Sequence, residues 1–226
     1  LLPEAAAYLI GHYSDGKTAD LRRATLVLPG QRARRRIIEL LLDEAEAQSA
    51  KLIPPAAITL GALPDQLYPH TLPVADDITT RRAWSKALRK VRRSDLEEVF
   101  PDLPGHNDLA FWEDLAEVLL GLHKSVAAGG HRFSDVSNVC ASGHLFDDSP
   151  RWRTLAQVQK EYFSLLEEVS LADRFEASIA ALEAGVASFT GDLWFVSVAE
   201  LPAVTRKLIE SSDAKVRCLI HAPEDL

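Results

Sequence analysis

The sequence predicts an α/β fold: a mostly parallel sheet with helices on both faces, interrupted by a large all-helical insertion. Strand-helix-strand patterns occur at both ends of the 226-residue chain, whereas the block between them has helical periodicity and no convincing strand. Two strands alone bury too little apolar surface to form a stable sheet, so we expect both ends to share one sheet. The expected domains are a discontinuous α/β domain over residues 1–78 and 189–226 and a helical lobe over residues 79–188.

The N-terminal part predicts a helix, a polar loop, a strand, a helix and a strand in that order. Pro3 suits a first helical turn, and an alanine run follows it. Farther on, an apolar run of β type breaks at Pro29-Gly30 and opens into an amphipathic helix. The five elements are expected at residues 3–13, 14–20, 25–29, 32–48 and 57–60.

The rest of the chain predicts four helices and then a second strand-helix-strand pattern. The four helices are expected near residues 80–93, 109–127, 150–168 and 172–186. The two late strands are apolar, which is typical of a parallel sheet covered on both faces. They are expected at residues 192–198 and 216–220, on either side of a helix at 202–211.

The helix that follows Pro29-Gly30 has a strongly basic start. Backbone N–H groups in a first helical turn have no intrahelical partner and carry partial positive charge, so arginines beside them would surround a ready phosphate site. The alternative is a surface helix with solvated arginines. The candidate anion-binding residues are Arg32, Arg34, Arg35 and Arg36.

Charge is segregated along the chain, although the net charge of −8 argues against a protein that coats nucleic acid indiscriminately. Residues 81–93 carry seven basic side chains and no acid, whereas residues 94–118 carry eight acids and no Lys or Arg. Either two helices pair their charged faces, or the basic segment tracks phosphates. On the second interpretation the DNA-binding candidates include Arg82, Lys86, Arg89, Lys90 and Arg93.

The run Gly11–Thr18 matches the phosphate-loop pattern GxxxxGK[ST] letter for letter. It offers an alternative function in which Gly16, Lys17 and Thr18 bind ATP and magnesium. That pattern requires a strand before it and a helix that opens at the lysine. Residues 3–10 favour a helix instead, and too few residues separate Thr18 from the next strand for a crossover helix. We therefore expect a surface loop here.

Other chemistry-bearing residues do not form a recognisable site. His123, His131 and His144 lack carboxylate or Cys partners at ligand spacing, so we expect them at surface or capping positions and expect no metal site. The four tryptophans are expected to anchor cores.

Hydropathy favours a cytoplasmic protein with no membrane partner. No apolar run approaches the length of a membrane span, and the chain does not open with a charged leader and an apolar block. The lack of any Met in 226 residues suggests a fragment of a longer protein.

Several segments together resemble the N-terminal region of AddB-type proteins, the helicase-like subunits of bacterial double-strand-break repair helicase-nucleases. The run Thr25–Arg35 is similar to that family's apolar strand, Pro turn and Arg-rich helix start. Leu52–Pro55 and Ile58–Leu63 are like its next strand and turn. Further similar segments are Thr80–Arg89, Trp194–Ala203 and Cys218–Pro223.

This resemblance implies a superfamily 1 helicase-like fold of the P-loop class with a helical insertion and, as in many members, a lost ATP site. It implies binding of DNA, as single strands, ends or forks, without a cofactor and beside a helicase-nuclease partner subunit. Any nuclease would lie downstream of residue 226. The resemblance assigns phosphate contacts to Gln31, Arg32 and Arg34.

The leading interpretation is a non-catalytic, helicase-like DNA-binding and scaffolding module in DNA break repair. The enzyme alternative is an ATP-binding motor that uses the Gly11–Thr18 loop. The third is a pure protein-interaction module whose helical lobe docks a partner subunit.

Overall fold

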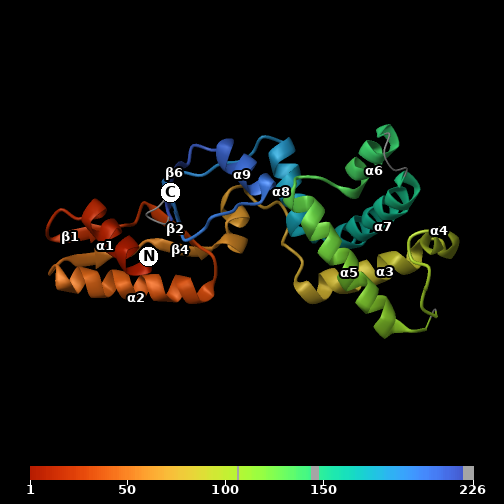
Figure 1. Ribbon diagram of the computed structural model, residues 1–226, viewed down its shortest axis with the longest axis horizontal. Coiled ribbons are helices and arrows are strands. Elements are labelled where there is room, and N and C mark those ends of the chain that lie inside the picture. The colour runs from red at the N-terminus through yellow and green to blue at the C-terminus, as the bar shows by residue number, and fades with distance from the viewer. Residues whose placement is uncertain (106, 144–147, 221–226) are drawn as a thin grey trace, which may run out of the picture. The chain divides into compact units, whose positions relative to one another are not determined.

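The computed structural model describes residues 1–105, 107–143 and 148–220. The chain divides into two compact units (Figure 1), one built from Leu1–Pro69 with Gly185–Leu226 and the other from His70–Ala184. The helical unit therefore spans residues 70–184, whereas the sequence predicted a helical lobe over residues 79–188.

The first unit is the α/β unit. Its helices and strands, in chain order, are α1 (Leu2–Tyr13), β1 (Thr18–Asp20), β2 (Ala24–Leu28), α2 (Gln31–Ala47), β3 (Lys51–Ile53), β4 (Ala56–Thr59), the 3-10 turns η1 (Leu60–Ala62) and η2 (Pro64–Gln66), β5 (Asp192–Val196), α9 (Ala203–Glu210) and β6 (Lys215–Leu219).

Strands from both ends of the chain share one four-stranded sheet with the order β4-β2-β5-β6. Every pairing in it is parallel, and the register at the centre sets Leu26 against Trp194. This confirms the α/β fold class with a mostly parallel sheet.

The prediction of a polar loop over residues 14–20 is wrong for its last three residues, because Thr18–Asp20 forms β1 and pairs in parallel with β3. Leu21 N donates to Ile53 O at 3.0 Å, and the pairing then stops at Pro54-Pro55. Proline has no N–H to donate, so two prolines split one long strand pair into β1-β3 and β2-β4. β1 has three residues and only one of them, Ala19, is apolar, so its composition gives little signal for a strand.

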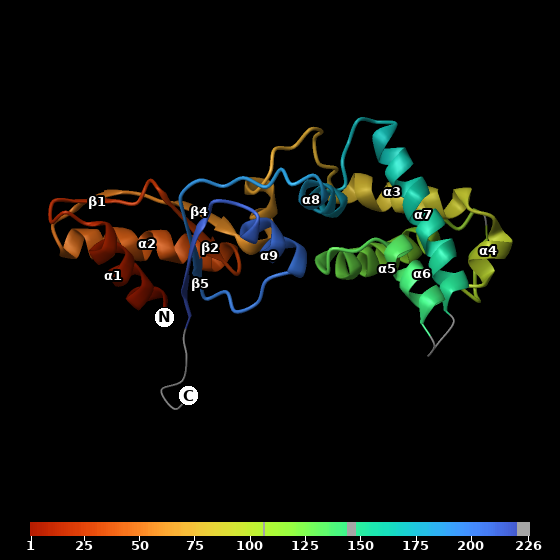
Figure 2. The same ribbon diagram turned by 90° about the horizontal axis from the view of Figure 1, so that it is seen from above.

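Helices cover both faces of the sheet. On one face α1 and α2 pack side by side (Figures 1 and 2) and bury Leu9, Ile10, Ile37 and Leu41 in one cluster with Trp194. Parallel crossovers are right-handed, and β2-α2-β4 and β5-α9-β6 step across the sheet in opposite directions. The helices α2 and α9 must therefore lie on opposite faces.

The second unit is all helical in its described residues apart from one isolated bridge, Val74 to Ala172. Its helices are α3 (Asp77–Lys90), α4 (Arg93–Glu97), α5 (Leu109–Ala128), α6 (Phe133–Ser142), α7 (Ser149–Glu167) and α8 (Arg174–Glu183).

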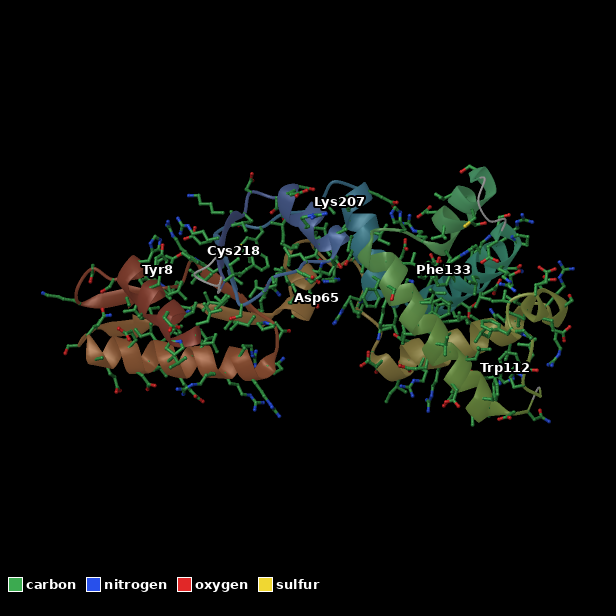
Figure 3. All side chains as sticks on the ribbon, viewed as in Figure 1. Tyr8, Asp65, Trp112, Phe133, Lys207 and Cys218 are labelled. Carbon is green, nitrogen blue, oxygen red and sulfur yellow. The ribbon has the colours of Figure 1, made fainter. Side chains whose placement is uncertain are left out.

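Two of these helices, α4 and α6, were not predicted. α4 is one short turn within a charged segment, and α6 buries only Phe133 of its ten residues, so neither has a strong apolar period. The core of the unit surrounds the fully buried Trp84. Trp112 (Figure 3) and, in the α/β unit, Trp194 are also buried, as expected of core anchors.

Across the described residues, no helix is both long enough and apolar enough to cross a membrane.

Candidate functional site

The α/β unit has a topological switch point between its two central strands. β2 and β5 are parallel neighbours, and the helices that follow them leave toward opposite sides of the sheet. In open α/β sheets, ligands bind outside the carboxyl ends of the strands at such a point. Here the chain after β2 is Pro29-Gly30 and the start of α2. The chain after β5 opens with Ser197, a non-glycine residue at φ 60°.

The first turn of α2 has no side chain that caps it. Gly30 is the N-cap residue in an extended conformation, and its lack of a side chain leaves the first backbone N–H groups without an intramolecular acceptor from the cap. A Cβ built on Gly30 would meet nothing within 4 Å, so packing does not require glycine here. The helix start is therefore open to an acceptor from outside the chain.

Charge along α2 opposes the dipole of the helix. Its first turn has no acid and its last turn has no base. Its four arginines lie in the first two turns, and its acids lie farther along the helix. Acids are favourable near a helix N-terminus and bases near a C-terminus, each by about 0.3–1 kcal/mol. The basic start of α2 thus lowers the stability of the helix, which is the pattern expected where a sequence serves binding rather than folding.

The arginines of α2 differ in whether the chain itself neutralises them. Arg36 Nη1 donates to Glu39 Oε2 at 2.8 Å, so Arg36 has an acid of its own helix as a partner. Arg32, Arg34 and Arg35 form no ion pair with any acid in the described part of the chain. Arg32 and Arg35 are exposed, as is Gln31, and Arg34 is half-buried. The structure therefore gathers the predicted anion-binding residues at one helix start, with Arg36 paired.

The basic segment of the helical unit divides in the same way. Arg81 pairs with Glu117 at 2.9 Å, and Lys90 lies 3.5 Å from Glu161. The first pair joins the basic segment to the acidic segment as the charge-pairing interpretation expects, whereas the partner of Lys90 lies on α7, outside residues 94–118.

Arg93, the last basic candidate, bonds Glu97 at 3.1 Å and also donates to the backbone carbonyls of Leu103 and Pro104. It therefore holds a loop in place and has little capacity left for a ligand.

Three basic side chains of α3 stay outside these pairs. Arg82, Lys86 and Arg89 are exposed and form no ion pair within the described residues. Their spacing of four and then three residues places them on one helix face. They form a basic stripe, which is the part of the predicted phosphate-tracking face that has no ion pair among the described residues.

The phosphate-loop interpretation of Gly11–Thr18 is wrong on geometry. α1 ends at Tyr13, and Thr18 begins a strand rather than a helix. The N–H groups of Lys17 and Thr18 donate to Asp15 Oδ1 at 2.9 and 2.7 Å, so the amides that would hold a phosphate are already bonded. These bonds lower the pKa of Asp15 and keep it charged against an anion. Gly16, Lys17 and Thr18 therefore do not form the ATP and magnesium site that the alternative requires.

The expectation that the histidines lie at the surface is wrong for His123. This side chain is 1% exposed and lies in a buried polar network that joins four helices. His131 is exposed, and His144 lies outside the described residues. The partners of His123 are distant in sequence, so spacing gave no signal. No cluster of three metal-ligating side chains occurs in residues 1–105, 107–143 and 148–220.

Two members of this network, Asp173 and Tyr162, have perturbed pKa values. Burial raises the pKa of Asp173, but hydrogen bonds from His123 and Tyr162 outweigh it and hold that pKa below its usual value. Burial, with the nearby Asp173 carboxylate, raises the pKa of Tyr162. Perturbed groups often mark active sites. Because all three side chains are buried, we assign this network to the fold.

No protein-family model matches the chain, and no curated protein matches it. Two basic surfaces remain as candidate sites, the α2 start (Gln31, Arg32, Arg34, Arg35) and the α3 stripe (Arg82, Lys86, Arg89).

Proposed function

We propose that this protein binds DNA through the α2 start and the α3 stripe, and that it acts as a non-catalytic, helicase-like scaffolding module in DNA break repair. The observation that carries the proposal is the α2 start, where uncapped amides and unpaired arginines occupy the switch point of a parallel sheet. Phosphate oxygens are the acceptors that match uncapped amides and guanidinium groups together.

Nucleic acid suits these surfaces better than a small phosphorylated ligand. The α3 stripe repeats basic residues along a helix face, and a stripe of this kind follows a phosphate backbone. The net charge of −8 makes binding depend on these local surfaces and predicts marked weakening with salt.

The AddB-type assignment is a further part of the proposal. Support comes from the order of elements: a strand, a Pro-Gly turn and an arginine-rich helix, then a helical block, then two more parallel strands. In this assignment the module holds a single strand, end or fork in the cytoplasm beside a helicase-nuclease partner subunit. Chemistry then belongs to other parts of the assembly.

The direct test is fluorescence anisotropy of a labelled single strand and a labelled fork at low salt. Two double variants remove the same charge from the α/β unit: R32A/R35A removes unpaired arginines, and R22A/R36A removes arginines that pair with Asp20 and Glu39. We expect R32A/R35A to weaken binding and R22A/R36A to leave it close to wild type. Equal effects of the two doubles would reject the assignment to the α2 start.

A second candidate function is protein interaction alone, with the arginines solvated. The observation that favours it is an exposed apolar pair on α5, Phe111 at 44% and Val118 at 63% exposure, which lie seven residues apart on one helix face. Absence of DNA binding by the wild-type chain at low salt would favour this candidate.

A further inference from the structure

A different surface of the α/β unit gathers aromatic rings beside an arginine. Tyr8 (Figure 3) and His12 are one turn apart on α1, with ring planes 8° from parallel and centroids 5.9 Å apart. Both rings meet Trp194 edge to face, at 5.9 and 5.5 Å. Trp194 is 1% exposed, whereas Tyr8 is 53% exposed. The buried indole thus fixes two rings, and one of them presents more than half its surface to solvent.

Arg217 of β6 completes this surface. Its guanidinium carbon lies 5.0 Å from the centroid of Trp194, and its Nη1 donates to His12 Nε2 at 3.1 Å. No carboxylate in the described chain forms an ion pair with Arg217. A guanidinium has five N–H donors, so Arg217 is held in place by two aromatic partners and keeps donors for a phosphate.

Gly11 follows Tyr8 by three residues on α1, so the two positions are neighbours on the helix surface. A glycine within a helix lowers its stability, yet a Cβ at Gly11 would meet nothing within 4 Å. Internal packing therefore gives no reason for glycine at this position. Its effect is to leave the helix surface beside Tyr8 without a side chain.

We propose that Tyr8, His12 and Arg217 form a stacking site for a base of single-stranded DNA, with Arg217 bound to an adjacent phosphate. The inference rests on the proposed DNA binding and adds a base contact to the phosphate contacts of the α2 start. Stacking on an aromatic ring tolerates every base, because each base has a π face. A duplex hides those faces within its own stack, so this site selects single strands.

The test compares two labelled strands of equal length and charge, oligo(dT) and a fully abasic oligomer, against the full chain. Wild type is expected to bind oligo(dT) more tightly than the abasic strand. Tyr8→Ala is expected to remove that difference, lowering oligo(dT) affinity roughly five- to tenfold and leaving abasic affinity unchanged. Tyr8→Phe keeps the ring and is expected to match wild type.

Gly11→Ala gives a second, independent test. Because alanine is the better helix former and the added methyl meets nothing in the chain, this variant is expected to melt at a higher temperature than wild type. If a base lies against this face, the same variant binds oligo(dT) more weakly.

The outcomes separate the stacking site from the proposed function. Equal wild-type affinity for both strands, unchanged by Tyr8→Ala, would reject the stacking site and leave the phosphate contacts standing. An equal loss for both strands in Tyr8→Ala would also reject stacking. A wild-type chain that binds neither strand at low salt would overturn both the stacking site and the proposed function.

Discussion

His123 Nε2 lies 3.0 Å from Asp173 Oδ1 in the core of the helical unit, and the surrounding bonds fix which atom donates. The N–H of Phe133 donates to Gln159 Oε1, so the Gln159 amide nitrogen faces His123 Nδ1 at 3.0 Å and donates to it. His123 Nδ1 is therefore an acceptor, and Nε2–H donates to Asp173. Together these bonds link α5, α6, α7 and the start of α8.

Asp173→Asn is expected to destabilise the helical unit. The carboxylate accepts from His123, from Tyr162 O–H at 2.7 Å and from backbone N–H groups of α8, and an amide cannot satisfy the first two donors together. We expect a loss of about 2–3 kcal/mol at neutral pH, measured by urea unfolding. Exposed Glu167→Gln is the control and should stay within about 0.5 kcal/mol of wild type. An Asp173→Asn variant as stable as wild type would contradict the role given to this network.

Acid should remove the contribution of Asp173. Its folded-state pKa lies below the usual value, so the carboxylate stabilises the fold above the unfolded-state pKa of about 3.9, and this is lost as pH falls through the folded value. The difference in stability between wild type and Asp173→Asn should therefore shrink below about pH 4. Unfolding curves recorded across that range test this, and a constant difference would refute the linkage.

A capping residue at Gly30, the N-cap of α2, is expected to raise stability and to lower DNA affinity. Gly30→Asp supplies a capping carboxylate at a position where an added Cβ meets nothing within 4 Å. The folded state should gain a few tenths of a kcal/mol, so the melting temperature should rise slightly. The same carboxylate repels phosphates, so DNA affinity should fall. Gly30→Ser caps without charge and should weaken binding much less. A more stable Gly30→Asp variant with wild-type affinity would show that DNA does not approach this turn.

Two double variants of α3 separate free from paired cations. R82A/R89A removes two residues of the α3 stripe, whereas R81A/K90A removes the same charge from residues that pair with Glu117 and Glu161. We expect R82A/R89A to weaken DNA binding. We expect R81A/K90A to change DNA binding little, because Arg81 and Lys90 already have acid partners. Loss of these exposed ion pairs should also leave the fold intact, since each contributes only about 0.2–1 kcal/mol to its stability. Anisotropy at one low salt concentration is sufficient, and an equal loss in both doubles would point to net charge alone.

We expect that ATP does not bind at the Gly11–Thr18 loop and therefore does not change the melting temperature. Because Asp15 already accepts from the amides of Lys17 and Thr18, ATP with magnesium should not raise the melting temperature of wild type. Lys17→Ala should melt like wild type in the presence and absence of ATP. A shift with ATP that Lys17→Ala abolishes would restore the motor interpretation.

Elements could be predicted from the sequence where the residues that determine them form one uninterrupted segment. Apolar runs located β2, β5 and β6, and the basic start of α2 could be predicted because Gln31–Arg36 is one uninterrupted segment. The pattern of residues predicted neither of the three-residue strands β1 and β3, because each is a strand through its pairing with the other and not through its own composition.

Contacts between distant residues could not be predicted. His123 and Asp173 are 50 positions apart, and His12 and Arg217 are 205 positions apart. The sequence also gave no means to tell Arg81, which pairs with Glu117, from its neighbour Arg82. Pairing depends on which helix faces which, and this is decided by packing of the whole unit.

The most direct test of the central claim is a salt titration of single-strand binding by wild type and R32A/R35A. If Arg32 and Arg35 neutralise phosphates at the α2 start, log affinity falls linearly with log salt, and the variant loses roughly 0.7 of slope for each phosphate contact removed. R22A/R36A should keep the wild-type slope. An R32A/R35A slope and affinity identical to those of wild type would contradict the account, because the unpaired arginines of α2 would then have no part in holding DNA.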